Sequence, residues 1–158
     1  MATRRVKQTT GPKLFKVKGI TIGIVVAQWH NDITNALLKG ATTALKQAGI
    51  KDSSIKIKKV PGSFELPLGA QWQIKQDNID AVLCLGCIIQ GETPHFDYIS
   101  QAVANGIMQL NLAYNIPVIF GVLTTNTLKQ AKERSGGKHG NKGIDAAVAA
   151  LELLEGKK

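Results

Sequence analysis

The 158-residue sequence lacks several motifs that would define an enzyme class at once. It has no GxSxG elbow, which argues against a serine hydrolase. No two of its three histidines have the spacing of metal ligands, so no metal site is expected. The glycine-rich stretch at 134–143 lacks the spacing of a P-loop, so a nucleoside triphosphate is not implied.

Cysteine is scarce, and its two residues, Cys84 and Cys87, form a CxxC motif. Both lie inside an apolar run that is typical of a β-strand. Side chains three positions apart on a strand point to opposite faces of the sheet. We therefore expect two buried thiols and not a redox pair.

Long hydrophobic runs are also absent, since none reaches the roughly 20 residues that span a membrane. The first residues are basic but have no apolar signal-peptide core, so we expect a cytoplasmic protein with no membrane partner. A composition with 44% hydrophobic and 20% charged residues is typical of a soluble globular domain. We predict one domain over 19–158 that follows a basic extension over 1–18.

The net charge of +9 is concentrated at the two ends of the chain. Of the 20 Lys and Arg residues, eight lie in residues 1–18 or at the last two positions, which leaves 12 against the 11 acidic residues. A solvated basic tail is the usual meaning of such a segment. Because no groove-reading motif is present, specific nucleic-acid binding is not expected.

Strand and helix periodicities alternate along the chain. Apolar and β-branched runs predict strands over 21–27, 54–60, 79–89 and 117–124, the second of them an edge strand because lysines alternate along it. Helical spacing predicts a first helix that starts near 32 and is closed by Gly49, and a second that ends near 76. Three further helices are predicted to cover 99–110, 128–134 and 144–151. This order predicts an α/β fold of the flavodoxin-like kind, with three αβα layers and a doubly wound, four-stranded parallel sheet.

Polar and aromatic residues interrupt the pattern where the strands end, at 28–31, 61–65, 90–95 and 124–126. In open α/β sheets, ligands bind beyond the carboxyl ends of the strands. We therefore expect these four turns to meet at the end of the sheet where the strands finish. Trp29 is either a core aromatic residue or a platform on which a flat ligand stacks.

Two other segments, one around Glu65 and one at 134–143, allow two interpretations each. Glu65 follows a Pro-Gly turn and is either an acceptor for ligand N–H groups or a carboxylate that favours a helix start. The glycines of 134–143, with Arg134, Lys138 and Lys142, either suit a phosphate or form a plain surface loop.

His95 stands one residue after a proline, where the third strand gives way to a helix. Thr93 is a good N-cap and Pro94 suits the first helical position, which places His95 in the first turn. The positive end of the helix dipole favours a neutral imidazole there, and a neutral imidazole can accept a proton. The alternative is an ordinary surface histidine.

Five segments, taken in order, carry a resemblance: GIVVAQWHNDITNALLKGA, VPGSFELP, LGCIIQGETPHFDYI, PVIFGVLTTNT and ERSGGKHGNKGIDAAVAALELL. They resemble the 6,7-dimethyl-8-ribityllumazine synthase family over about residues 19–155. The resemblance implies a cofactor-free transferase of riboflavin biosynthesis. Its reaction condenses 5-amino-6-(D-ribitylamino)uracil with 3,4-dihydroxy-2-butanone 4-phosphate and releases phosphate and water.

The resemblance also implies a role for each site residue. By position, His95 transfers protons, Arg134 binds the phosphate, and Trp29, which stands where phenylalanine is usual, stacks on the pyrimidine ring. The other implied substrate-binding residues are His30, Ser63, Phe64 and Glu65 for the ribityl chain, Ile88 and Ile89 for the ring, Gly91, Glu92 and Thr93 near the phosphate, and Phe120 and Lys142.

The family's assembly is a homopentamer, built in some members into a shell of sixty subunits. The resemblance places Phe120, Arg134 and Lys142 in the neighbouring subunit, so that each active site lies between two chains. Two alternatives remain at this point: a module of the same fold that binds a flavin or lumazine without turnover, and a nucleic-acid binder that depends on the basic tail.

Overall fold

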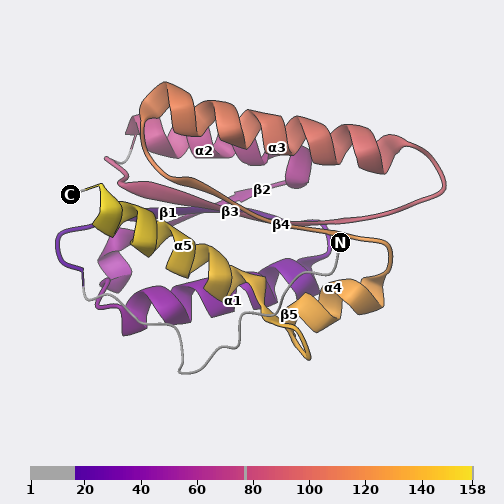
Figure 1. Ribbon diagram of the computed structural model, residues 1–158, viewed down its shortest axis with the longest axis horizontal. Coiled ribbons are helices and arrows are strands. Elements are labelled where there is room, and N and C mark those ends of the chain that lie inside the picture. The colour runs from indigo at the N-terminus through magenta and orange to yellow at the C-terminus, as the bar shows by residue number, and fades with distance from the viewer. Residues whose placement is uncertain (1–16, 77, 158) are drawn as a thin grey trace.

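The computed structural model describes residues 17–76 and 78–157. Four strands form one parallel sheet in the order β2-β1-β3-β4, as the sequence predicts. Helices α2 and α3 cover one face of the sheet, and α1, α4 and α5 cover the other (Figure 1). The elements are β1 (Ile22–Ala27), α1 (Asn31–Gln47), β2 (Ile55–Val60), α2 (Leu66–Gln76), β3 (Ala81–Ile89), α3 (His95–Tyr114), β4 (Val118–Thr125), α4 (Leu128–Arg134), β5 (Ser135–Gly137), β6 (Gly140–Asn141) and α5 (Lys142–Gly156), with 3-10 turns η1 (Asp52–Ser54) and η2 (Ser63–Glu65).

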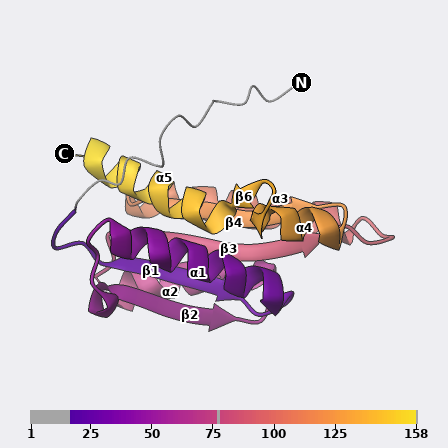
Figure 2. The same cartoon turned by 90° about the horizontal axis from the view of Figure 1, so that it is seen from below.

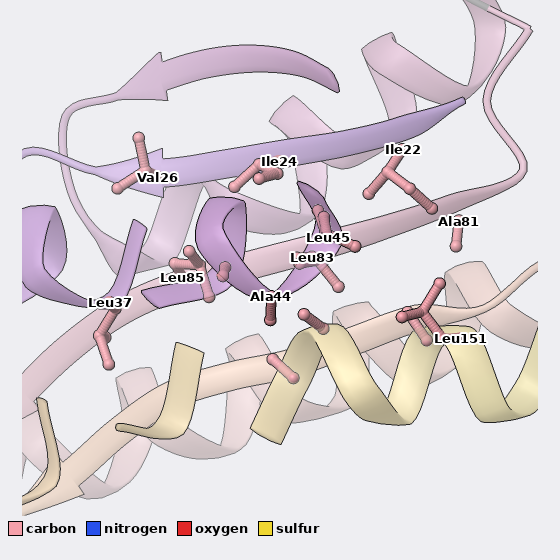
Figure 3. Close-up of a cluster of buried hydrophobic side chains, with 14 of the residues drawn as sticks. Ile22, Ile24, Val26, Leu37, Ala44, Leu45, Ala81, Leu83, Leu85 and Leu151 are labelled. Carbon is pink, nitrogen blue, oxygen red and sulfur yellow. The ribbon is translucent and has the colours of Figure 1, made fainter. Parts of the chain in front are cut away.

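The core consists of two apolar layers, one on each face of the sheet. Ile24 of β1 and Leu83 of β3 pack with Leu37 of α1 and Leu151 of α5 in one layer (Figure 3). Alternate residues of the same strands, such as Val25 and Val82, pack beneath α2 and α3 in the other layer. Because β3 is buried on both faces, its sequence is continuously apolar and does not alternate.

Strand β2 is an edge of the sheet, as its lysines predict. Lys56 and Lys59 are exposed, and Ile57 keeps half of its surface in water, at 50%. Lysine on an edge strand discourages pairing with a further strand.

The register brings the carboxyl ends of the strands to one side of the sheet. Ala27 pairs with Val60, and Ile89 pairs with Thr125. Figure 2 shows that the connection from β3 to α3 reaches beyond the end of the strand. The turns that carry the predicted site residues therefore share one end of the domain, as expected for this fold.

Two local predictions are wrong. Helix α3 begins at His95 with Pro94 as its N-cap, and not one residue earlier with Thr93. The carbonyl of Pro94 already accepts the N–H groups of Asp97 and Tyr98, at 3.0 and 3.3 Å, so Pro94 is the capping position. The glycine-rich segment after α4 forms the antiparallel hairpin β5–β6, and not an open loop.

The predicted basic extension over 1–18 lies largely outside the described residues. Of its last two residues, Val17 is buried in the core and donates its N–H to the carbonyl of Ala48 at 3.2 Å. Within 17–76 and 78–157, no helix is both long and apolar enough to cross a membrane.

The two thiols are buried on opposite faces of β3, which confirms the interpretation of the CxxC motif. Cys84 packs in the layer under α2 and α3, whereas Cys87 packs in the layer under α1 and α5. Burial raises the pKa of Cys84 from 9.0 to about 12. Burial, together with the carboxylate of Asp32, raises the pKa of Cys87 to about 11.

These raised pKa values predict a loss of stability in alkali. Above pH 9 the thiols ionise in the unfolded chain but stay protonated in the folded chain, so each contributes stability that is present below pH 9 and lost as the pH rises towards 11 or 12. The expected loss approaches about 1.4 kcal/mol per pH unit for each thiol. Urea unfolding between pH 8.5 and 10.5 measures it. The variant with both Cys84→Ala and Cys87→Ala should show a shallower slope, and an identical slope would contradict this explanation.

Candidate active site

The turns after β1 and β2 form the first group of predicted site residues. The N–H of Trp29 donates to the carbonyl of Pro61 at 3.1 Å, which joins the two turns. Trp29 is 69% exposed and Phe64 is 58% exposed. These exposures rule out the interpretation of either side chain as a core aromatic, and they leave both rings free to stack on a flat ligand.

His30 turns the chain from β1 into α1. Its backbone is left-handed, with φ of 55° and ψ of 51°, and its carbonyl accepts the N–H groups of Ile33 and Thr34. A residue with a Cβ adopts this conformation at a cost of about 1 kcal/mol. The turn leaves the imidazole exposed beside Trp29 at the carboxyl end of the sheet.

Glu65 stabilises its own turn. Its Oε2 accepts the N–H of Gly62 at 2.9 Å, and its own N–H donates to the carbonyl of Gly62 at 3.3 Å. This contact supports one of the two interpretations of Glu65, that of a carboxylate that favours a helix start. Trp29 lies close by, because a Cβ on Gly62 would meet its indole at 3.8 Å.

Ser63 and the isoleucine pair are less accessible than the sequence suggested. The Oγ of Ser63 is buried against Gly86 of β3, where an added Cβ would lie 2.5 Å from it, so any ligand contact of Ser63 would use its backbone. Ile88 packs on the α2–α3 side of the sheet and Ile89 on the α1–α5 side. The structure therefore does not bring these two side chains to one surface.

The turn from β3 to α3 carries Gly91, Glu92 and Thr93, all exposed, and leads to His95 at the first position of a 20-residue helix. The first N–H groups of a helix have no partner within it and form the positive end of its dipole. An anion that approaches this turn would meet those N–H groups next to the imidazole.

The second group lies along the outer edge of β4. A cavity of about 410 Å³ is lined there by seven consecutive residues, from Ile119 to Thr125. Since successive side chains of a strand point to opposite faces, a cavity that touches all seven follows the free edge of the strand. Phe120, which is 41% exposed, lines it.

Two cations and one carboxylate line the same cavity. Arg134 ends α4 and donates from Nη1 to the carbonyl of Gln130 at 3.0 Å. Lys142 begins α5 and forms an ion pair with Asp145, with 2.7 Å between Nζ and Oδ2. The net positive charge suits an anion.

Lys138 does not belong to this cavity, although the sequence placed it with Arg134 and Lys142. Lys138 lies on the β5–β6 hairpin, and its ammonium group is 3.4 Å from Oε1 of Glu133 in α4. Two polar residues near the cavity were missed by the sequence analysis, namely Asp145, which holds Lys142, and Asn141, which caps α5. An asparagine before an apolar helical pattern is a typical N-cap signal and would have revealed Asn141.

The predicted residues therefore form two separate groups within one chain. Trp29 and Phe64 follow β1 and β2, whereas Arg134 and Lys142 border β4 at the opposite edge of the sheet. Neither Trp29, Phe64, Glu65 nor His95 lines the cavity along β4. In the part of the chain that the structure describes, no three His, Cys, Asp or Glu side chains group as metal ligands do.

Comparison with known proteins identifies the family of this chain. The family of 6,7-dimethyl-8-ribityllumazine synthase matches residues 19–158. The protein of that name from Cytophaga hutchinsonii is 56% identical over 132 residues, which cover 84% of this chain and 83% of the relative. The one from Parabacteroides distasonis is 50% identical over 135 residues, 85% of this chain and 84% of the relative. The chain belongs to the 6,7-dimethyl-8-ribityllumazine synthase family.

The contact between Glu65 and Gly62 predicts a measurable effect on stability. Glu65→Ala should lower the free energy of unfolding by about 1 kcal/mol, because the N–H of Gly62 loses its acceptor. Glu65→Gln keeps an acceptor oxygen and should lose less. Urea unfolding compares the three proteins, and unchanged stability in Glu65→Ala would show that the carboxylate is free for a ligand instead.

Proposed function

We propose that this chain condenses 5-amino-6-(D-ribitylamino)uracil with 3,4-dihydroxy-2-butanone 4-phosphate to 6,7-dimethyl-8-ribityllumazine. Its family makes it a transferase of riboflavin biosynthesis that acts on small molecules. The proposed catalytic domain is residues 19–158, preceded by a basic extension over 1–18, in a cytoplasmic protein. The match of the family to 19–158 supports this boundary.

The reaction requires positioning and proton transfer. The 5-amino group attacks the ketone of the butanone phosphate and loses water to give an imine. Phosphate then leaves by β-elimination, and the resulting enol becomes a ketone. The ribitylamino nitrogen attacks that ketone and closes the ring with loss of a second water. Orienting two substrates contributes more to such a reaction than any single proton transfer, which is worth roughly 10²–10⁴-fold.

The exposed aromatic residues are the proposed pyrimidine site. Trp29 stacks on the ring, with Phe64 beside it, and the turn of Ser63 and Glu65 holds the ribityl chain together with His30. The exposures of Trp29 and Phe64 and the contact of Trp29 with the second turn support this assignment. Ile88 or Ile89, but not both side chains, borders the ring.

The proposed phosphate site joins the turn of Gly91, Glu92 and Thr93 to Arg134 and Lys142. His95 lies next to the turn and moves protons as the phosphate leaves. Arg134 offers a planar pair of donors that match a phosphate, and Phe120 closes the apolar side of the cavity.

The observation that carries the proposal is the separation of these groups on opposite sides of one chain. Strands lie about 4.8 Å apart, so β2 and β4 are separated by roughly 14 Å across the sheet. The family is oligomeric. We propose a homopentamer in which the cavity along β4 of one chain meets the β1–β2 turns and His95 of the next. In a head-to-tail ring every chain gives one group and receives the other.

The first test is turnover with variants of the cavity. The wild-type protein should form fluorescent lumazine from the two substrates, and Arg134→Ala should lower kcat/KM by about 10- to 100-fold, because charge-assisted hydrogen bonds are worth roughly 1.5–3 kcal/mol. Arg134→Lys should recover part of the loss. Lys138→Ala is the matched control, since this cation lies in the same segment but pairs with Glu133 outside the cavity.

Two results would contradict the proposal. Absence of product from the wild-type protein with authentic substrates would remove the enzymatic assignment. An effect of Lys138→Ala as large as that of Arg134→Ala would show that general positive charge, and not the cavity, binds the phosphate.

The second test concerns the shared site. His95→Ala and Arg134→Ala chains, each impaired alone, should recover activity when they are unfolded and refolded together. With random mixing, roughly one site in four combines an intact His95 with an intact Arg134 of the neighbour. The measurement is the rate of lumazine formation beside the native mass. If mixed rings form but are no more active than the average of the two variants, both residues act within one chain.

A further inference from the structure

Asn141 holds the anion cavity to the rest of the domain through three hydrogen bonds. Its Oδ1 accepts the N–H of Gly143 at 2.8 Å, which caps α5. Its Nδ2 donates to the carbonyl of Ala36, in the second turn of α1, at 2.9 Å. The same Nδ2 donates to the carbonyl of Ser135, across the β5–β6 hairpin, at 3.3 Å.

Asn141 and one of its partners, Ser135, are immediate neighbours of the two cations. Ser135 follows Arg134, and Asn141 itself precedes Lys142. The hydrogen bonds of one side chain therefore fix the backbone at both cations relative to α1. We propose that Asn141 is a positioning residue that sets Arg134 and Lys142 for phosphate binding. This inference rests on the phosphate site of the proposed function.

Two glycines show that the contact leaves no room for adjustment. A Cβ on Gly40 of α1 would lie 2.6 Å from the amide atoms of Asn141. A Cβ on Gly143 would collide with the carbonyl oxygen of Leu37 and lie 2.9 Å from Oδ1 of Asn141. Helix α1 and the start of α5 thus approach each other at backbone distance, and the amide of Asn141 fills the remaining space.

Helix α1 connects this contact to the other group of site residues. The helix begins directly after His30, and Ala36 lies six residues further on, about 9 Å along the axis. The amide of Asn141 therefore sets the cations relative to the turn that carries Trp29. Displacing the amide should move the cations and leave the stacking residues in place.

Asn141→Ser tests this role without a change of charge. Serine is also a good N-cap and can accept the N–H of Gly143, but it lacks the amide that reaches Ala36 and Ser135. The KM for the butanone phosphate, and the Kd for inorganic phosphate from calorimetry, should each rise about tenfold. The KM for the ribitylaminouracil should stay within about twofold of the wild-type value.

Asn111→Ser is the matched control. Asn111 also makes three hydrogen bonds, since its Nδ2 donates to the carbonyls of Ile107 and Val118, at 2.9 and 2.8 Å, and its Oδ1 accepts the N–H of Val118 at 2.8 Å. These contacts join α3 to the beginning of β4, at the opposite end of the sheet. Asn111→Ser should lower Tm about as much as Asn141→Ser while both KM values stay unchanged.

Gly40→Ala is a second variant that displaces the amide from the other side. Alone it should weaken phosphate binding as Asn141→Ser does, because its methyl group occupies the position of the amide. In an Asn141→Ala background the γ atom that the methyl would meet is absent, so Gly40→Ala should add little. Full additivity of the two effects would mean that Gly40 does not act through Asn141.

The outcomes separate this inference from the proposed function. Equal rises in both KM values, or unchanged phosphate binding in Asn141→Ser, would overturn the positioning role. If Arg134→Ala binds inorganic phosphate as the wild type does, the phosphate site itself is wrong and the inference falls with it. If the wild type binds phosphate but forms no lumazine, the reaction is wrong, and the phosphate Kd of Asn141→Ser still decides the role of Asn141.

Discussion

Burial of β3 on both faces is the constraint on which the rest of the structure depends. Residues from Ala81 to Cys87 are covered by helices on each side, and a parallel sheet needs such cover because its crossover helices lie on its faces. With β3 beside β1 and β4, all strands end on one side of the domain. The sequences of the turns at that end do not have to follow an apolar pattern, because the packing of helices on the sheet, and not the turns, stabilises the fold.

The sheet was predictable because the residue types of each strand reflect how that strand is buried. Continuous apolar character marked β3, and alternating lysines marked β2 as an edge. The β5–β6 hairpin was not predictable, because it depends on the amide of Asn141 and the carbonyl of Ala36, which are 105 residues apart. The left-handed backbone of His30 was not predictable either, because a residue with a Cβ seldom adopts this conformation.

The chemistry of the site was visible in residue types, but their directions were not. Aromatic residues in the turns, a helix-start histidine and two cations near glycines could all be read from the sequence. The 3-10 turn Ser63–Glu65 directs Ser63 inward, and strand alternation sends Ile88 and Ile89 to opposite faces. The pairing of Lys138 with Glu133 depends on the fold of the hairpin. The directions of Ser63 and Lys138 follow from tertiary packing, and local spacing does not contain them, whereas the opposite directions of Ile88 and Ile89 follow from strand alternation alone.

The close approach of α1 and α5 also limits how the sequence can diverge. The apolar positions along this seam can accept some change of side chain, because an apolar contact tolerates a residue of similar volume. At the two glycines even one methyl group meets backbone or amide atoms. Protein engineers who wish to recruit this scaffold for other phosphorylated ligands should therefore diversify the surface of the β4 cavity and keep Gly40 and Gly143 unchanged, because a side chain at either position would push α1 and α5 apart.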